Sequence, residues 1–154
     1  MDPQAIHAFV RRLGRAVIKP LDGNGGRGVV VLDHADRNLN ALVDLSLAPG
    51  APVMVQGFVP DVAQGDRRVL LVDGEPLAVL NRVASADDWR CNMHVGAQAS
   101  WVELNDADRH VCAQLKPFLR EHGLFFTGID IIGDRLTEIN VTSPTGVEEV
   151  LAAG

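Results

Sequence analysis

The chain has 154 residues, 47% of them apolar, and its 14 basic and 20 acidic residues give a net charge of −6. This size and composition predict a globular protein with one or two cores. The acidic balance and the lack of a basic run argue against a nucleic-acid partner. No apolar run approaches the roughly 18 residues of a membrane span, so no membrane partner is expected and the cytoplasm is the predicted location.

Cysteine and histidine spacing gives no sign of a metal or redox site. Cys91 and Cys112 are widely separated and form no CxxC pair, so we expect both to be reduced bystanders. No two histidines have H-x-x-x-H spacing, which favours isolated surface or core histidines over metal ligands.

Capping residues and apolar spacing predict a mixture of helices and strands in the first part of the chain. Asp2 is a candidate N-cap, Gly14 a candidate helix stop, and Asp36 a candidate cap for the next helix. The predicted elements are a helix over 3–13, a strand over 15–20, a strand over 28–33, a helix over 38–47 and a strand over 52–58.

The second part of the chain continues the α+β pattern, with hairpins that predict a mostly antiparallel sheet. Asp73-Gly74 is a strong hairpin-turn signal. Asn105 is a candidate N-cap, Gly123 a stop, and Pro117 is expected to kink the helix between them or perturb its hydrogen bonding. The predicted elements are strands over 67–73 and 76–83, a long loop over 84–103, a helix after Asn105, a hairpin over 124–141 and a short helix over 147–154. The loop is the candidate lid.

A glycine-rich stretch, IKPLDGNGGRGVVVLD at residues 18–33, matches two nucleotide-loop patterns. The dinucleotide pattern needs a helix after the glycines, but a strand is expected here. The kinase pattern needs a lysine on the next strand, whereas Lys19 precedes the loop. The Walker pattern needs a lysine followed by Ser or Thr after the last glycine. The glycines alone therefore leave open a flexible hairpin without a ligand.

The hairpin GIDIIGDRLTEIN carries three hard oxygen donors, Asp130, Glu138 and Asn140, between isoleucines. A simple two-residue turn at Gly133-Asp134 would put Asp130 on the other face from Glu138. An odd-numbered loop or a bulge puts Asp130 opposite Glu138, with the isoleucines together on the other face, and we predict this odd register. Two carboxylates and an amide oxygen suit Mg²⁺ that shares substrate phosphates. The alternative is a solvated polar face.

Together these segments resemble a known family over nearly the whole chain. IKPLDGNGG, VQGF with GDRRVLLVDGEP, NRV, RCN and GIDIIGDRLTEINVTSPTG are similar, in order and register, to the C-terminal part of the ATP-grasp domain of bacterial glutathione synthetase. The resemblance implies an α+β ATP-grasp fold that holds ATP between two subdomains. It also implies a Mg²⁺-dependent ligase, with Mn²⁺ as an alternative metal, that joins γ-glutamylcysteine to glycine through an acyl phosphate.

The resemblance also assigns roles to individual residues. It implies phosphate contacts for the lysine and the glycine loop, adenine contacts for the strand that ends in VQGF, and a ribose contact for the acid that follows. The nucleotide set is Lys19, Gly23, Gly25, Gly26, Gly28, Val55, Gln56, Phe58 and Asp66. Catalytic roles near the transferred phosphate fall to Arg68 and Arg82. The substrate-side set is Arg90, Asn92, Ser143, Pro144, Thr145 and Gly146, and the metal ligands are Asp130, Glu138 and Asn140.

The chain departs from the family in two respects. Family members have a longer N-terminal portion with a substrate domain and an earlier ATP-contacting lysine, so residues 1–154 are expected to be a partial domain. The expected protein partner is a second copy of the chain, in a homo-oligomer, or the missing N-terminal half. RCNMHVGA stands where the family has R-G-N and small residues, which leaves the acceptor open. RCNMH is similar to ATP-grasp ligases that attach glutamate to protein tails. The other alternative is a non-catalytic nucleotide-binding fragment.

Overall fold

The computed structural model describes residues 2–23, 25–48, 50–85, 89–91 and 97–153. The chain divides into two compact units, Met1–Phe58 and Val59–Gly154. Each unit has its own antiparallel sheet and its own apolar core, as the composition predicts.

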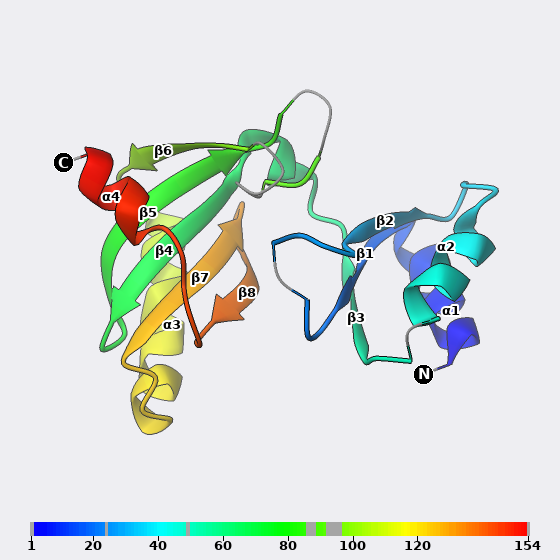
Figure 1. The fold of residues 1–154 in the computed structure, drawn as a ribbon, viewed down its shortest axis with the longest axis horizontal. Helices are drawn as coiled ribbons and strands as arrows, with labels where there is room; N and C mark the ends of the chain where they lie inside the picture. Colours follow the sequence, from blue (N-terminus) through cyan, green and yellow to red (C-terminus); the bar gives the residue numbers. More distant parts are fainter. Residues whose placement is uncertain (1, 24, 49, 86–88, 92–96, 154) are drawn as a thin grey trace. The chain divides into compact units, whose positions relative to one another are not determined.

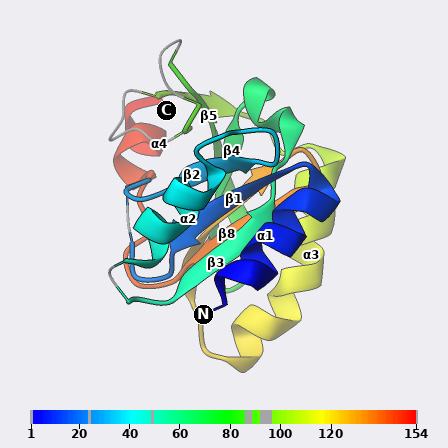
Figure 2. The same cartoon turned by 90° about the vertical axis from the view of Figure 1, so that its right-hand side faces the viewer.

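The first unit is a three-stranded sheet in the order β2-β1-β3 with two helices on one face (Figure 2). Its core joins Val10, Ile18, Leu32 and Val43. In chain order the elements are α1 (Pro3–Leu13), β1 (Arg15–Pro20), β2 (Val30–Asp33), α2 (Leu39–Leu47) and β3 (Val53–Gly57).

Local signals account for the ends of both helices in this unit. Asp2 accepts a 2.9 Å hydrogen bond from the Gln4 N–H at the start of α1, and Gly14 ends that helix with a φ of 80°. Asn38 is the N-cap of α2, but its side chain makes no capping hydrogen bond. The Asp36 side chain, two residues earlier, accepts a hydrogen bond from the Asn38 N–H. The predicted helices and strands of this unit are therefore confirmed to within two residues at each end.

The second unit is a five-stranded antiparallel sheet in the order β6-β5-β4-β7-β8 (Figure 1). A long helix, α3, packs on one face, and the short α4 contacts β5 and β6. The elements are the 3-10 helix η1 (Pro60–Gln64), β4 (Asp66–Val72), β5 (Glu75–Val83), β6 (Gln98–Val102), α3 (Asp106–Glu121), β7 (Phe126–Ile132), β8 (Arg135–Asn140) and α4 (Val147–Ala153).

The core of this unit lies between α3 and the sheet. Val69, Ile129 and Ile131 point from the central strands toward Val111 and Leu119 on the helix. Because strand residues alternate between faces, the same strands present their intervening polar residues to the opposite face. That opposite face carries the candidate site.

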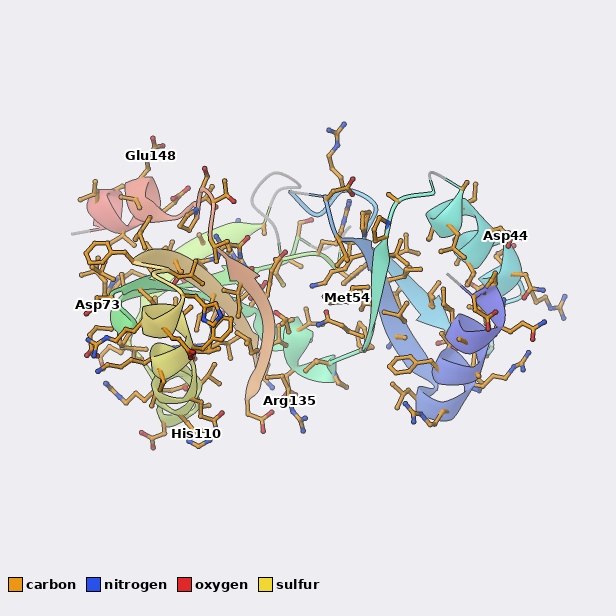
Figure 3. The ribbon with its side chains drawn as sticks, turned by 90° about the horizontal axis from the view of Figure 1, so that it is seen from below. Asp44, Met54, Asp73, His110, Arg135 and Glu148 are labelled. Atoms are coloured by element: carbon orange, nitrogen blue, oxygen red, sulfur yellow. The ribbon has the colours of Figure 1, made fainter. Side chains whose placement is uncertain are left out.

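Charged pairs fix α3 at both ends. At its start Asn105 and Asp108 form a capping box, and Arg67 on β4 donates through Nε and Nη2 to the fully buried Asp108 carboxylate. The single Nε–H is shared between the two oxygens, at 3.0 and 2.9 Å. At the other end Arg120 contacts the β4–β5 turn by hydrogen bonding to Asp73 (2.8 Å). Figure 3 labels Asp73 at that turn and His110 on the helix.

One sequence expectation needs correction in this unit, and the expected effect of Pro117 on hydrogen bonding is present. The predicted loop over 84–103 contains β6, an edge strand that pairs with β5, so only part of that segment is irregular. Ala99 and Val102 of this strand are half-buried and its other residues are exposed. The sequence therefore shows no alternation of apolar and polar residues there. In the helix, Pro117 removes one backbone N–H, yet α3 continues as one helix to Glu121.

Two further sequence predictions concern the cysteines and the membrane. Cys91 and Cys112 are both free and buried, as expected for reduced bystanders. Among the described residues, no helix has the length and apolar character needed to span a membrane.

Candidate functional site

Three buried charged residues and the half-buried Asp66 meet on the face of the large sheet that α3 leaves uncovered. Asp66 and Arg68 lie two residues apart on β4, so they share a face. Asp66 is directly opposite Arg82 on β5, and Arg68 is directly opposite Asp130 on β7. The sequence predicted roles for all four, and the sheet register brings them together.

Arg68 uses all three of its guanidinium nitrogens within the protein. Nε and Nη2 form a fork on the two carboxylate oxygens of Asp130, with an Nη2–Oδ2 distance of 2.9 Å. Nη1 donates to the backbone carbonyl and the hydroxyl of Thr145, at 3.0 and 3.2 Å. A bidentate arginine–carboxylate pair of this kind is among the stronger hydrogen-bonding arrangements in proteins.

Arg82 is held differently from Arg68. Its Nη2 donates to Asp66 Oδ2 at 2.6 Å and lies 3.0 Å from Asp130 Oδ1, so it bridges two carboxylates. Its buried Nε–H has no partner among the described residues, and the same is true of Asp66 Oδ1. A buried donor and a buried acceptor without partners are rare, because each loses its water without replacement. They are therefore the groups on this face best suited to a polar ligand.

The close charges shift the pKa values of the two carboxylates in opposite directions. Burial, followed by the neighbouring Asp130 carboxylate, raises the pKa of Asp66 from 3.8 to about 7, against the opposing effect of Arg82 and Arg68. Burial also acts to raise the pKa of Asp130, but the hydrogen bonds and charges of Arg68 and Arg82 outweigh it and lower that pKa below 3.8. Asp130 is therefore the carboxylate that stays ionised.

The β7–β8 hairpin adopts the predicted odd register. Asp130 lies directly opposite Glu138, and Asn140 lies opposite Gly128, so the three oxygen donors share one face. The chain reaches this register through a two-residue turn at Gly133-Asp134 combined with a bulge between Asp130 and Ile131. The bulge leaves Thr137 as the extra residue, and its hydroxyl donates to the Asp130 carbonyl at 3.1 Å.

The donor set on this hairpin fits a divalent cation that takes oxygen ligands. Two carboxylates and an amide oxygen face the same side, and the buried Asn140 Nδ2 has no partner among the described residues. Within the described ranges, no group of three or more His, Cys, Asp and Glu side chains is arranged so that it could hold a metal ion by itself. Mg²⁺ in particular needs few protein ligands, because it keeps waters and takes substrate phosphates.

The substrate-side segment packs directly on this cluster. Pro144 lies over Gly128, where an added Cβ would come within 2.9 Å of Pro144 Cβ and 3.2 Å of Arg68 Cδ. Gly146 is buried with a φ of 119°, beside Leu80 and the Arg68 stem. Ser143 and Thr145 are exposed. Gly128 was not among the residues predicted from the sequence, although a glycine inside a strand often marks the close approach of another segment.

The glycine loop belongs to the first unit and connects β1 to β2, as predicted. Gly25, Gly26 and Gly28 all have positive φ, a conformation that side chains other than glycine adopt at a cost. A Cβ at Gly28 would lie 2.9 Å from Pro20 Cγ. Gly23 has ordinary φ and looser contacts, so three of the four glycines are required by the backbone itself.

Lys19 and the proposed adenine strand lie on the same small sheet. Lys19 is half-buried on β1, opposite Met54 of β3, and shares a face with Gln56. Figure 3 labels Met54 on the side of β3 turned away from α1. Val55 instead packs against the helix-side core, so its side chain is not available to a ligand. β3 pairs only with β1, which leaves its outer backbone edge turned away from the sheet.

Phe58 has a neighbour that the sequence did not single out. The Arg15 guanidinium lies 4.1 Å from the Phe58 ring centroid, and the Arg15 carbonyl accepts the Phe58 N–H at 3.3 Å. Of the remaining predicted residues, Arg90 is half-buried, and Asn92 lies outside the described residues.

Comparison with known sequences gives a consistent result over the whole chain. The family described as prokaryotic glutathione synthetase, ATP-grasp domain, matches residues 1–154. Glutathione synthetase from Thermosynechococcus vestitus is 47% identical over 97% of this chain, and that from Synechococcus elongatus is 51% identical over 94%. The matches cover 47% and 45% of those proteins, so the chain spans about half the length of its curated relatives.

Solved structures agree on the fold. D-cycloserine synthetase DcsG superposes with a TM-score of 0.72 at 18% identity, over 92% of this chain and 52% of that one. The ATP-grasp ligase PsnB, complexed with a phosphomimetic minimal precursor, Mg and ADP, gives a TM-score of 0.63 at 26% identity, over 93% and 43% of the two chains. The α+β ATP-grasp fold predicted from the sequence is confirmed.

Proposed function

Because the chain belongs to the prokaryotic glutathione synthetase ATP-grasp family, we propose that it binds ATP with Mg²⁺ and serves the ligation of γ-glutamylcysteine to glycine. One observation carries the proposal. Asp66, Arg82 and Asp130 form a charged cluster in which one buried donor and one buried acceptor have no partner among the described residues, beside a hairpin face with three oxygen donors.

Each part of the proposed nucleotide site uses chemistry present in the described residues. Asp66 Oδ1 can accept a hydrogen bond from a ribose hydroxyl, and the β3 edge can meet the polar edge of adenine through backbone groups at Val55 and Gln56. Lys19 provides positive charge for phosphates. The glycines let backbone N–H groups approach phosphate oxygens closely.

The proposed metal ligands are Asp130, Glu138 and Asn140. The low pKa of Asp130 keeps that carboxylate ionised, as metal ligation requires. When bound, Mg²⁺ would neutralise phosphate charge. Mn²⁺ is an alternative with the same preference for oxygen ligands.

The chemistry we propose needs no nucleophilic side chain. A carboxylate oxygen of γ-glutamylcysteine attacks the γ-phosphorus of ATP, ADP leaves, and an acyl phosphate forms. The glycine amine then attacks the acyl carbon, inorganic phosphate leaves, and the amine loses a proton. Arg82 contributes fixed positive charge and an available N–H, which favour the transition state of the first step.

Two other functions remain as alternatives from the sequence. A ligase that attaches glutamate to protein tails would use the same nucleotide site with another acceptor. A non-catalytic nucleotide-binding fragment would keep the site without turnover. Arg90, Asn92 and the segment Ser143–Gly146 are the proposed acceptor-side residues, and the cytoplasmic location and the oligomeric state stay predictions.

Isothermal titration of the 154-residue chain with ADP and Mg²⁺ tests the nucleotide site. We expect binding in the micromolar range that Glu138→Ala weakens at least about tenfold, the effect of losing one charged ligand. Asp134→Ala, in the exposed turn of the same hairpin, is the matched control and should bind like the wild type. The absence of any heat at millimolar ADP would contradict the proposal.

The acceptor is tested separately by phosphate release. The chain would be assayed with γ-glutamylcysteine and glycine, alone and fused behind the N-terminal half of the Thermosynechococcus vestitus relative. Product formation only with glycine and γ-glutamylcysteine supports the glutathione function. Turnover of glutamate onto peptides by the fusion would favour the first alternative, and nucleotide binding without turnover the second.

A further inference from the structure

The two buried arginines of the candidate site have different hydrogen-bonding states. Arg82 keeps a buried Nε–H without a partner among the described residues, whereas every nitrogen of Arg68 already donates to Asp130 or Thr145. A group that stabilises a transferred phosphate must have a donor to offer. Arg82 has a whole N–H group to offer, whereas each Arg68 nitrogen is already engaged in holding Asp130 or Thr145.

Arg68 connects two parts of the site that come from different segments of the chain. Asp130 is a proposed metal ligand on β7, and Thr145 belongs to the proposed substrate-side segment. The surroundings fit this bridge, because Gly128 leaves room for Pro144 and the Arg68 stem, and Gly146 packs against the same stem. The Arg68 side chain is 7% exposed, so water competes little for its hydrogen bonds.

We propose that Arg68 is a positioning residue, which couples the Asp130 carboxylate to the segment Ser143–Gly146. This inference rests on the proposed function, which assigns metal binding to Asp130 and the substrate side to the segment Ser143–Gly146. The coupling itself is a property of the chain without any ligand. A change at Asp130 should therefore alter the backbone around Thr145, because Arg68 hydrogen-bonds to both residues.

Hydrogen exchange of the 154-residue chain, without metal or nucleotide, tests the coupling. The amides to follow lie in residues 145–150, where the Val150 N–H bonds to the Gly146 carbonyl in α4. We expect Arg68→Lys to speed exchange there at least about fivefold, because lysine cannot hold both partners in a planar fork. The α3 amides serve as the internal reference and should keep their wild-type rates.

A double-mutant cycle separates coupling from local damage. Asp130→Asn should speed exchange at 145–150 by a similar factor, and the double variant with Arg68→Lys should exchange no faster than either single variant. If Asp130→Asn leaves the segment at wild-type rates, or if the two effects multiply, the coupling is overturned. Asp134→Asn in the exposed hairpin turn is the control for a charge change nearby.

Variants of Thr145 keep the inference testable if the buried changes unfold the sheet. Thr145→Val removes the hydroxyl that Arg68 contacts, and Thr145→Ser retains it, on an exposed residue. We expect faster exchange with valine and wild-type exchange with serine, whereas equal rates in both variants would contradict the role.

A titration with Mn²⁺ separates the positioning role of Arg68 from the proposed metal site. If no metal binds, the proposed function loses its metal site, while the exchange cycle still decides on Arg68.

Discussion

Asp66 and Arg82 lie directly opposite each other on β4 and β5, and Arg82 Nη2 donates to Asp66 Oδ2 over 2.6 Å. Despite this partner, burial and the Asp130 carboxylate leave the pKa of Asp66 near 7. Arg82 is shared between the half-buried Asp66 and the buried Asp130, so it cannot fully compensate both carboxylates. Asp66 is therefore the member of the pair that takes up a proton first as the pH falls.

The stability of the chain should consequently depend on pH through Asp66. The folded state holds this proton up to about pH 7, and the unfolded chain releases it near pH 3.8, so the stabilisation is complete below pH 3.8 and is lost as the pH rises toward 7. The expected slope is up to about 1.4 kcal/mol of unfolding free energy per pH unit.

Asp66→Asn should flatten that slope, which urea unfolding at several pH values would measure. The opposite contribution of Asp130, whose pKa is lowered, is lost only as the pH falls below about 3.8, so it does not mask the effect. A variant with the same slope as the wild type between pH 4 and 7 would mean that Asp66 does not carry this proton.

The Arg67–Asp108 pair should contribute strongly to stability. Asp108 is fully buried, accepts hydrogen bonds from Arg67 and also caps α3. Asp108→Ala leaves the mostly buried Arg67 without its partner and removes half of the capping box. We expect a loss of about 3 kcal/mol in urea unfolding. Asp106→Ala, an exposed change in the same helical turn, should cost less than about 0.5 kcal/mol.

The glycine loop offers a matched pair of substitutions. Gly28→Ala meets both a φ of 71° and a contact of 2.9 Å with Pro20, whereas Gly23→Ala has ordinary φ and contacts no shorter than 3.4 Å. We expect the first to lower stability by about 1–2 kcal/mol and the second to change it by less than about 0.5 kcal/mol. Thermal unfolding compares them, and equal effects would show that the loop backbone does not depend on Gly28.

The sequence predicted much of the fold because its signals were local. Asp2, Gly14 and Asn105 determine helix ends through bonds to nearby backbone groups, and the isoleucines of the last hairpin fix which residues share a face. The hairpin register was predicted with either an odd-numbered loop or a bulge as its cause. The structure has the bulge after Asp130, a choice that depends on pairing across two strands. The edge strand β6 was missed because its exposed residues show no alternation and its partner β5 supplies the pairing.

The difference between Arg68 and Arg82 could not be predicted from the sequence. Both arginines lie on neighbouring strands beside the same Asp130, so the residue types and spacing are alike. What separates them is the fold of a distant segment, which brings the Thr145 carbonyl and hydroxyl to Arg68. Contacts across about 75 residues of chain depend on tertiary packing, which a local pattern does not encode.

The two cysteines should react slowly with thiol reagents while the chain is folded. Burial raises the pKa of both thiols, that of Cys112 to about 11, and nearby carboxylates add to the effect. Because the thiolate is the reactive form, we expect modification by a disulfide reagent at pH 8 to be slower than in urea by at least about a hundredfold. The thiol of Cys91 also donates to the Val62 carbonyl at 3.6 Å, which holds it beside η1. Rapid labelling of Cys91 in the folded chain, read by mass spectrometry, would show that this part of the second unit opens readily, whereas slow labelling of both supports their role as packing residues.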